Sequence, residues 1–547
     1  MSSRRNFIQL TGAALVGAVL PARLKAARGA LVPRADLVIR GGTVFDGTGA
    51  AGVSADVLVR GGRIASVGPR LSAGGAEEVD ARGLAVAPGF IDIHSHADGT
   101  IFDDPAMESI IRQGVTTVVV GQDGGLVSAP ASGPAGRQPS VGAFMAAVER
   151  SPGSANVAAM VGLGGVRGAV VGLDDRPATP AELARMTRMV EQALVDGACG
   201  ASSGLEYTPG AFAPLSELIE LCRPLAALRL PYATHMRNED DRLLEAIAES
   251  VAVAEGAGCP LQISHLKTQG PRNWGRLDDA FGAVEGARSR GVDAAFDRYP
   301  YLAYQTGLTN LFPVWSRDGG TRAFLARLAD DATAARIRSE TLAKVELIGG
   351  WDNVQITSVR AAADRAAEGQ RLGTYAKDAG LDPYQAAVGL LRRSDGSVGM
   401  VGFAMSEENL ERILAHPLGM VCSDGGAFAM SGPARIGQPH PRSLGTFPRV
   451  LGRYVRERGT LTLPQAVHKM TGQPASRLRL ADRGRIAPGL AADVVVFDPS
   501  TVADRATFAD PYQYPTGIDL VLVNGEIAMR SGERTAARSG GVVRPRA

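Results

Sequence analysis

The sequence predicts an α/β fold: a (β/α)8 TIM-like barrel, a small β-sandwich domain built from both chain ends, and a subdomain inserted between barrel strands 7 and 8. The chain has 547 residues, which exceeds the roughly 250–300 residues at which a single core stops growing. Short β-branched runs separated by glycine pairs occur near both ends. Between them, short apolar runs alternate with helical stretches at intervals of about 30 residues, the length of one βα unit.

The N-terminal 27 residues have the pattern of a Tat-type signal peptide. Arg4 and Arg5 precede a mildly apolar run from Phe7 to Leu20. That run is too short to span a bilayer about 30 Å thick, so we expect no stable membrane anchor. This pattern predicts export by the twin-arginine route to the periplasm or the outside of the cell. The alternative is a frayed amphipathic N-terminus that is not a targeting signal.

The two chain ends share a strand-like texture. The segments ADLVIRGGTVFDGTG and ADVLVRGGRIASVG lie near the N-terminus, and AADVVVFDPS and GIDLVLVNGEIAMRSG lie near the C-terminus. Alternating β-branched residues bounded by glycine are typical of strands and hairpins. We therefore predict one discontinuous β-sandwich domain from residues 34–87 and 481–535.

The central part of the chain, 88–480, is predicted to be the barrel. Short continuous apolar runs between helices are typical of buried parallel strands. Eight such runs can be counted from FIDIH to the one that ends at Asp424, including a further strand near 159–165. The stretch from about 302 to 400 is too long for a simple connection and predicts the inserted subdomain.

Composition narrows the function classes. The 58 basic and 56 acidic residues leave a formal charge of +2, which gives no support for nucleic-acid binding. An apolar fraction of 45% indicates a globular chain. The four cysteines are scattered and form no C-x-x-C motif, so we interpret them as buried thiols rather than a disulfide framework. Oligomeric state is left open.

Polar residues gather where a barrel carries its chemistry, at the carboxyl ends of the strands. His94 and His96 are two residues apart, so on a strand their side chains point the same way. Imidazole and carboxylate groups are ligands that suit Zn²⁺ and similar ions. The predicted strand ends carry His94, His96, Asp123, Glu206, His235, His265 and Asp424.

A plainer interpretation of this set is that the histidines cap strand ends by hydrogen bonding. Four of only seven histidines lie at predicted strand ends, and this concentration favours the metal site. The other three, His416, His440 and His468, are interpreted as structural.

At these motifs the sequence resembles the amidohydrolase superfamily. The segment APGFIDIHSHAD, flanked by β-rich ends, is similar to that superfamily. More narrowly, the chain resembles the N-acyl-D-amino-acid deacylases, or D-aminoacylases, over about residues 34–530. The motifs that carry this resemblance, in order, are QGVTTVVVG, SSGLEYTPG, YATHMRNE, ISHLK, DRYPY, SDG and HPRSLGTFPRVLG.

The resemblance implies roles for individual positions. His94 and His96 match the first-strand metal pair, and His235 and His265 match the ligands of strands 5 and 6. Asp424 matches the eighth-strand aspartate, which contacts metal or its water and shuttles a proton. One or two Zn²⁺ ions are implied.

Two positions depart from the family pattern. The second-strand motif of well-known D-aminoacylases ends G-N-C-G with a metal-binding Cys, whereas here it is GQDGG with Asp123 in the Cys place. Many other amidohydrolases use a carboxylated Lys on strand 4, where Glu206 stands here. Either carboxylate could bridge metals. The sequence interpretation favours Glu206, with Asp123 as the second candidate or a turn residue.

The resemblance further implies how the chemistry and substrate binding work. Zinc would activate a water, Asp424 would take its proton and later give it to the leaving amine, and the amide would be cleaved. Lys267, Tyr299 and Arg442 match positions that hold the substrate's α-carboxylate, for which the planar guanidinium fork of Arg is suited. Singly, they could instead be a solvated Lys, a core Tyr and a surface Arg.

The expected function is therefore zinc-dependent hydrolysis of N-acyl-D-amino acids, small substrates with a carboxylate. Because a fold and a metal site do not fix the substrate, an amidohydrolase acting on dipeptides or cyclic amides, as dipeptidases and hydantoinases do, is the first alternative. The second is an exported, non-catalytic binding protein on the same scaffold.

Overall fold

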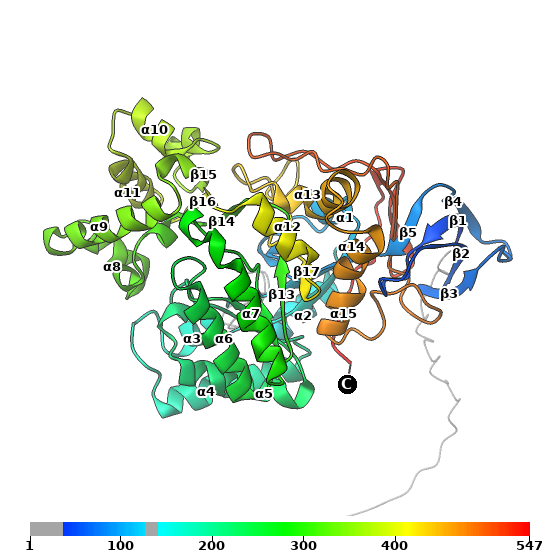
Figure 1. The fold of residues 1–547 in the computed structure, drawn as a ribbon, viewed down its shortest axis with the longest axis horizontal. Coiled ribbons are helices and arrows are strands. Elements are labelled where there is room, and N and C mark those ends of the chain that lie inside the picture. The colour runs from blue at the N-terminus through cyan, green and yellow to red at the C-terminus, as the bar shows by residue number, and fades with distance from the viewer. Residues whose placement is uncertain (1–36, 126–139, 547) are drawn as a thin grey trace, which may run out of the picture.

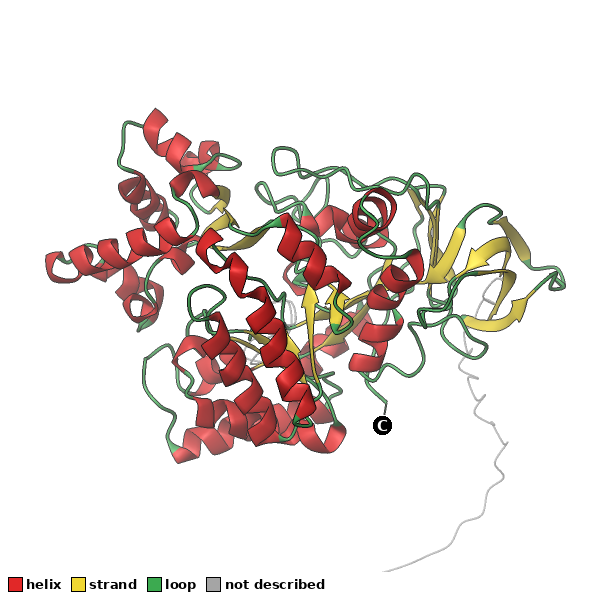
Figure 2. Cartoon of the chain, viewed as in Figure 1, coloured by secondary structure: helices red, strands yellow, loops and turns green. Residues whose placement is uncertain are grey.

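The computed structural model describes residues 37–125 and 140–546. The predicted signal peptide, 1–27, lies outside the described residues. Two regions make up most of the molecule. Parallel strands surrounded by helices form the middle, and a mostly antiparallel sheet lies at one side (Figures 1 and 2). Within the described residues, none of the helices is long and apolar enough to cross a membrane.

Strands from both chain ends form one nine-stranded sheet at the right of Figure 1. β5 pairs antiparallel with β18, and this ladder joins the two ends of the chain. The order along the sheet is β21-β20-β19-β18-β5-β1-β2-β3, with β4 beside β1. The strands are β1 (Leu37–Val44), β2 (Val53–Arg60), β3 (Arg63–Gly68), β4 (Glu77–Asp80), β5 (Ala85–Pro88), β18 (Val494–Phe497), β19 (Ile518–Val523), β20 (Glu526–Arg530) and β21 (Glu533–Arg534).

This single hydrogen-bonded sheet differs from the two separate sheets of the predicted sandwich. The reason lies in β1, whose pairing shifts between Ile39 and Gly42. Its first half pairs with β4 and its second half, Thr43–Val44, pairs with β5. A bulge bends a strand and lets one strand serve two neighbours. Buried residues from both chain ends, such as Ile39 and Val494, share one core.

Nine short strands make two all-parallel sheets in the middle of the chain. The six-stranded sheet has the order β17-β13-β12-β11-β10-β9, and the three-stranded sheet has the order β6-β7-β8. Only Met160 separates β8 from β9, and a parallel bridge joins Ser95 to Gly425, just beyond β6 and β17. The strands are β6 (Phe90–Asp92), β7 (Val115–Val120), β8 (Asn156–Ala159), β9 (Val161–Gly162), β10 (Ala201–Gly204), β11 (Tyr232–His235), β12 (Leu261–Ile263), β13 (Ala294–Arg298) and β17 (Gly419–Val421).

Amphipathic helices cover the outside of these parallel strands. In α4, Thr179 and Glu182 form a capping box, Pro180 opens the first turn, and Met186 and Val190 face the core. The described helices around the strands are α1 (Glu108–Ile111), α2 (Val141–Arg150), α3 (Leu163–Val170), α4 (Pro180–Val195), α5 (Leu215–Leu228), α6 (Leu243–Ala257), α7 (Leu277–Ser289), α12 (Glu407–Ala415), α13 (Arg442–Arg449), α14 (Leu463–Met470) and α15 (Gly472–Arg477).

A separate group of elements lies between β13 and β17, at the upper left of Figure 1. Its three antiparallel strands have the order β14-β16-β15 and carry helices around them. The elements are β14 (Ala303–Gly307), α8 (Gly320–Arg327), α9 (Asp331–Leu347), β15 (Val354–Val359), α10 (Leu372–Asp378), α11 (Pro383–Arg393) and β16 (Val398–Phe403). A second buried cluster joins apolar residues of this insertion to residues from the parallel strands.

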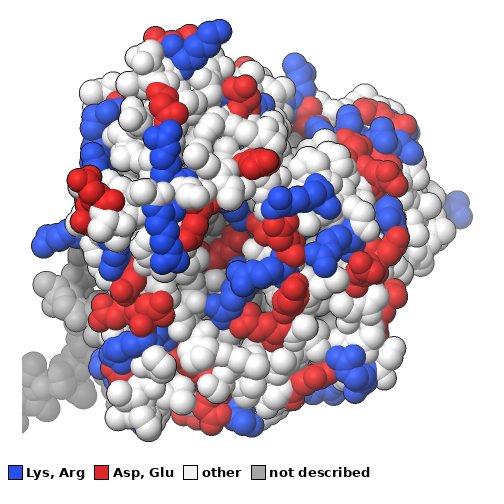
Figure 3. All heavy atoms as spheres, turned by 60° about the vertical axis from the view of Figure 1, so that its left-hand side comes forward, with Lys and Arg blue, Asp and Glu red and all other residues white. Residues whose placement is uncertain are grey.

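The surface and the thiols agree with the composition. Figure 3 shows acidic and basic side chains interspersed over the face it presents, with a hollow near its centre in which acidic side chains are visible. All four cysteines are buried and free, as predicted.

Candidate active site

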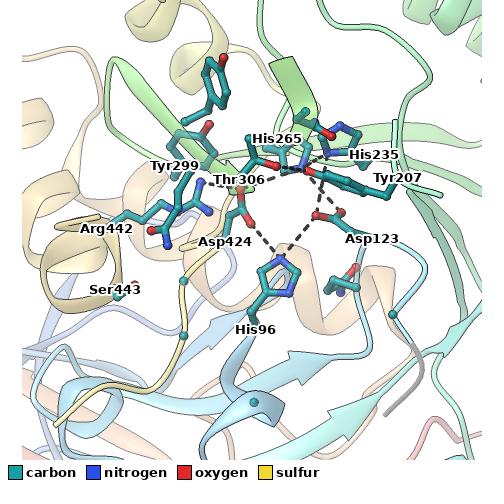
Figure 4. A pocket seen from close by; sticks show the side chains of 18 of the residues that line it. His96, Asp123, Tyr207, His235, His265, Tyr299, Thr306, Asp424, Arg442 and Ser443 are labelled. Carbon is teal, nitrogen blue, oxygen red and sulfur yellow. Dashed lines mark hydrogen bonds and ion pairs between the residues drawn. The ribbon is translucent and has the colours of Figure 1, made fainter. Parts of the chain in front are cut away.

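A cavity of about 560 Å³ opens at the carboxyl ends of the parallel strands. Its walls come from the segments that follow these strands and from the first residues of the insertion, which include Tyr304. Figure 4 shows Thr306 of the insertion beside the histidines. Of the ten predicted site residues, nine line it and His94 lies buried directly beside it. The lining residues among them are His96, Asp123, Glu206, His235, His265, Lys267, Tyr299, Asp424 and Arg442.

The four predicted histidines gather although they come from three different strands. The ring centroids of His94 and His96 are 5.4 Å apart, those of His94 and His265 are 5.0 Å apart, and those of His235 and His265 are 4.8 Å apart. Ser95, between His94 and His96, pairs with the backbone of the neighbouring strands. Its two neighbours in the chain therefore project to the same side.

Asp123 stands at the centre of these imidazoles. Its carboxylate lies 3.4 Å from Nε2 of His94 and of His96, 3.7 Å from Nε2 of His265 and 3.9 Å from Nδ1 of His235. The residue has a φ of +53°, and this left-handed turn carries its side chain back over the strand ends. Asp123 thus contacts every predicted histidine ligand.

Glu206 lies at the edge of the same cluster. Its carboxylate is 3.3 Å from Nε2 of His235, and it makes no ion pair within 4.0 Å with His94, His96 or His265. The insertion holds its other side, through Nδ2 of Asn310 at 3.3 Å and Nζ of Lys344 at 3.7 Å. The distances favour Asp123 over Glu206 as the central carboxylate, which reverses the preference drawn from the sequence.

The donor set fits a divalent metal ion. Both ring nitrogens of His94 and the Oδ1 atom of Asp123 are buried and have no hydrogen-bond partner among the described residues. Buried polar atoms are normally paired, so orphaned ones point to a missing partner. His94, Asp123, His265 and Asp424 each bring one donor atom to within 4.8 Å of the others. Neutral imidazole and carboxylate donors at this spacing suit zinc.

The electrostatics of the cluster also favour a cation. Burial by itself would lower the pKa of His235, but the carboxylates of Glu239 and Glu206 raise it to about 9. Burial would likewise lower the pKa of His96, and hydrogen bonds with Asp123 and Asp424 raise it well above its ordinary value. The cavity therefore attracts positive charge, which either protons or a metal ion can supply.

Glu239 was not among the predicted ligands. It forms a second possible metal-binding group with His235 and His265, and its side chain is only 4% exposed. It follows His235 by four residues, in the segment THMRNE. That spacing was the only signal in the sequence, because no strand end predicts the position of a residue in the following loop.

Asp424 and Arg442 form a buried ion pair at the cavity wall. Nη1 of Arg442 lies 2.6 Å from Oδ2 of Asp424, while Oδ1 of Asp424 faces Nε2 of His96 at 3.1 Å. Burial would raise the pKa of the Asp424 carboxyl, but the charge of Arg442 and the nearby histidines hold it well below its ordinary value. Asp424 is therefore ionised at neutral pH.

The other two predicted substrate residues lie beside this pair. The guanidinium of Arg442 sits 4.7 Å from the ring centroid of Tyr299, whose hydroxyl is buried and has no hydrogen-bond partner among the described residues. Lys267 is also buried, and its Nζ contacts Oε1 of Glu239 at 2.5 Å. Lys267 is thus a paired ammonium at the cavity wall, not a solvated surface Lys.

The three remaining histidines make structural contacts. Nε2 of His440 donates a hydrogen bond to the carbonyl of Ala303 at 3.0 Å, and Nδ1 of His440 accepts one from the backbone N–H of Arg442. His416 stacks on Phe281 with ring centroids 4.4 Å apart. His468 meets the carbonyl of Gly47 through Nδ1.

Similarity to known proteins agrees with this site. The family model described as "Amidohydrolase family" matches residues 77–339 and 426–529. The D-aminoacylase of Alcaligenes xylosoxydans xylosoxydans is 36% identical over 520 residues, which cover 93% of this chain and 97% of that protein.

Solved structures extend the comparison. The N-acyl-D-glutamate deacylase from Bordetella bronchiseptica, complexed with zinc and a phosphonate inhibitor that mimics the tetrahedral intermediate, is 37% identical with a TM-score of 0.78; the match covers 93% of this chain and 100% of that chain. A D-aminoacylase studied for its binuclear metal centre is 36% identical with a TM-score of 0.77 and coverages of 93% and 99%. The resemblance predicted from the sequence is confirmed: the chain belongs to the amidohydrolase family, among the N-acyl-D-amino-acid deacylases or D-aminoacylases.

Proposed function

We propose that this protein is a zinc-dependent hydrolase that cleaves the amide bond of N-acyl-D-amino acids to a carboxylic acid and a D-amino acid. The main supporting observation is one cavity at which four imidazoles, three lining it and His94 buried beside it, gather with the carboxylates of Asp123 and Asp424 next to a buried arginine. The relatives named above act on N-acyl-D-amino acids, and one of them is complexed with zinc.

Six residues would hold one or two zinc ions. When bound, Zn²⁺ lowers the pKa of a coordinated water toward neutrality and polarises the substrate's carbonyl. Asp123 contacts all four histidines, so we assign it the central place between the donors, and we assign Glu206 a supporting one. The six are His94, His96, Asp123, His235, His265 and Asp424.

Asp424 is the proton carrier of the proposed reaction. Arg442 holds Oδ2, so Oδ1 is the atom left to accept a proton from the attacking water. As the water oxygen bonds to the carbonyl carbon and the carbon–nitrogen bond breaks, Asp424 passes this proton to the departing amine. Its lowered pKa keeps it in the basic form before each turnover.

Arg442, Tyr299 and Lys267 are assigned to the α-carboxylate of the substrate. All three line the cavity, and the unpaired hydroxyl of Tyr299 is a free donor there. Only one guanidinium nitrogen of Arg442, Nη1, donates to Asp424, so the side chain keeps further N–H donors for a second carboxylate.

Two larger features are part of the proposal. We take the two parallel sheets as one (β/α)8 barrel, because Met160 and the Ser95–Gly425 bridge link them at both edges. We also take residues 1–27 as a Tat-type signal that exports the protein. The twin arginines and the short apolar run after them support this.

A substrate panel tests the activity. Zinc-loaded protein should hydrolyse N-acetyl-D-amino acids faster than their L-forms, dipeptides or hydantoins, with release of free amine as the readout. Preferred turnover of dipeptides or hydantoins would support the alternative amidohydrolase activities. Binding without turnover of any member of the panel would support a non-catalytic protein.

The isosteric pair Asp123→Asn and Glu206→Gln separates the two candidate carboxylates. Loss of charge at Asp123 removes the group in contact with four histidines, so zinc affinity should fall at least about tenfold, as for loss of a ligand or its close partner. Glu206→Gln should change it less. Zinc competition with a chelating dye measures both, and a larger loss for Glu206→Gln would contradict the assignment.

Asp424→Asn should nearly abolish turnover while most zinc remains bound. The amide cannot accept the proton from water, and positioned acid–base groups contribute about 10²- to 10⁴-fold to rates. The measurements are kcat and zinc content of the same preparation. A variant with near-normal kcat would exclude Asp424 as the proton carrier.

Arg442→Ala should raise KM for N-acyl-D-amino acids about 10- to 100-fold, since hydrogen bonds between charged groups contribute about 1.5–3 kcal/mol. The same variant should have a much smaller effect on KM for substrates whose α-carboxylate is capped as an amide. Parallel steady-state assays with both substrate types give the comparison. Equal effects on both would show that Arg442 does not bind the carboxylate.

A further inference from the structure

His265 has two buried partners competing for one ring nitrogen. Its Nδ1 lies 3.0 Å from Oε1 of Glu239 and 2.8 Å from Nζ of Lys267. The same two groups contact each other, with Nζ of Lys267 2.5 Å from Oε1 of Glu239. All three side chains are 4% exposed or less. Carboxylate, ammonium and imidazole thus form a closed triangle in the cavity wall.

The hydrogen-bond partner of Nδ1 determines whether Nε2 of His265 can bind a metal ion. A neutral imidazole carries one N–H, and its second nitrogen is an acceptor or a metal ligand. If Nδ1 donates to Glu239, Nε2 carries a lone pair, with Nδ1 of His235 at 3.2 Å and the carboxylates of Asp123 and Asp424 at 3.7 and 4.0 Å. If Nδ1 accepts from Lys267, the proton sits on Nε2 and His265 cannot bind a cation.

We propose that Glu239 is a positioning residue that makes His265 a competent metal ligand. By accepting a hydrogen bond from Nδ1 it directs the Nε2 lone pair into the cavity, and by pairing with Lys267 it removes the competing donor. This inference rests on the metal-dependent function proposed above and assigns a role to a residue outside the six donors. A carboxylate behind a metal-binding imidazole is a general means of fixing its tautomer.

The contacts of Glu239 favour this indirect role over direct metal binding. Its Oε1 atom is used by both His265 and Lys267, and Oε2 is 3.9 Å from Nε2 of His235. Among the described residues, Lys267 has no other ion-pair partner, so its ammonium would face Nδ1 alone if Glu239 were absent. The loss of Glu239 therefore not only removes an acceptor but also frees a competitor.

The test is a set of zinc dissociation constants at one fixed pH for wild type, Glu239→Ala and Glu239→Ala with Lys267→Met. Glu239→Ala should bind zinc at least about tenfold more weakly, in the range seen for loss of such partners. Adding Lys267→Met should regain most of this affinity, because no donor then competes for Nδ1. No loss in the first variant, or no regain in the second, would overturn the proposal.

A matched control separates this effect from general destabilisation. Glu217 is also buried and paired with a buried cation, Arg167, at 2.6 Å, and it contacts none of the site residues named here. Glu217→Ala should keep the zinc affinity of the wild type, and an equal loss there would overturn the proposal. If either Ala variant does not fold, Glu239→Gln and Glu217→Gln replace them, with a several-fold loss expected only for Glu239→Gln.

Zinc content at saturation shows whether Glu239 positions His265 or binds zinc itself. Glu239→Ala should hold as many ions per chain as wild type once zinc is saturating, whereas one ion fewer would make Glu239 a ligand and contradict its positioning role. Wild-type protein that binds no zinc would refute the proposed function itself. Wild-type binding with unchanged affinity in Glu239→Ala would refute only the role of Glu239.

Discussion

The contact between the Asp123 carboxylate and four imidazoles is the constraint on which the site depends. Burying an ionised carboxylate is expensive unless charge and hydrogen bonds compensate for it. Here the compensation comes from residues that follow three different strands, none of them close to Asp123 in sequence. Parallel strands make this possible because their carboxyl ends meet at one edge. The fold thus brings four imidazoles around one buried carboxylate at this point.

Buried carboxylates around Asp123 are also compensated, here by cationic side chains. Three of the carboxylates around the histidines contact a buried or half-buried cation: Asp424 contacts Arg442, Glu239 contacts Lys267, and Glu206 lies 3.7 Å from Lys344, which also pairs with Asp240. Lys344 belongs to α9 of the insertion, and Arg317 from the same segment donates to the backbone carbonyl of Glu206. The insertion is therefore joined to the active site by charge, and Arg442 links the proton carrier to the expected carboxylate site.

The sequence predicted the positions of the strand ends well and the directions of side chains less well. The alternation of apolar runs and helices, with polar residues at the ends of the runs, predicted seven site residues, of which six line the cavity. The other three, Lys267, Tyr299 and Arg442, came from the family resemblance, and they line it too. The central place of Asp123 depends on its left-handed backbone, at a φ of +53°, which no residue pattern there reveals. Glu239 lies in a loop beyond a strand, where spacing along the chain does not determine position in space.

The joined β sheet carries a similar lesson. The sequence at both chain ends indicated strands that would pair with one another, and β5 and β18 form such a pair. The number of sheets depended on one irregularity, the shift in β1 between Ile39 and Gly42, which splits its pairing between two neighbours. Such a shift follows from local packing, so propensity alone could not decide between one bent sheet and two.

The central claim is that buried imidazoles and carboxylates create a metal-dependent amide hydrolase. The most direct test is to strip the purified protein with a chelator, remove the chelator, and titrate zinc while following hydrolysis of an N-acetyl-D-amino acid. Turnover should vanish on stripping and return in proportion to bound zinc, reaching its maximum at one or two ions per chain. Full turnover by protein shown to contain no metal would contradict the account.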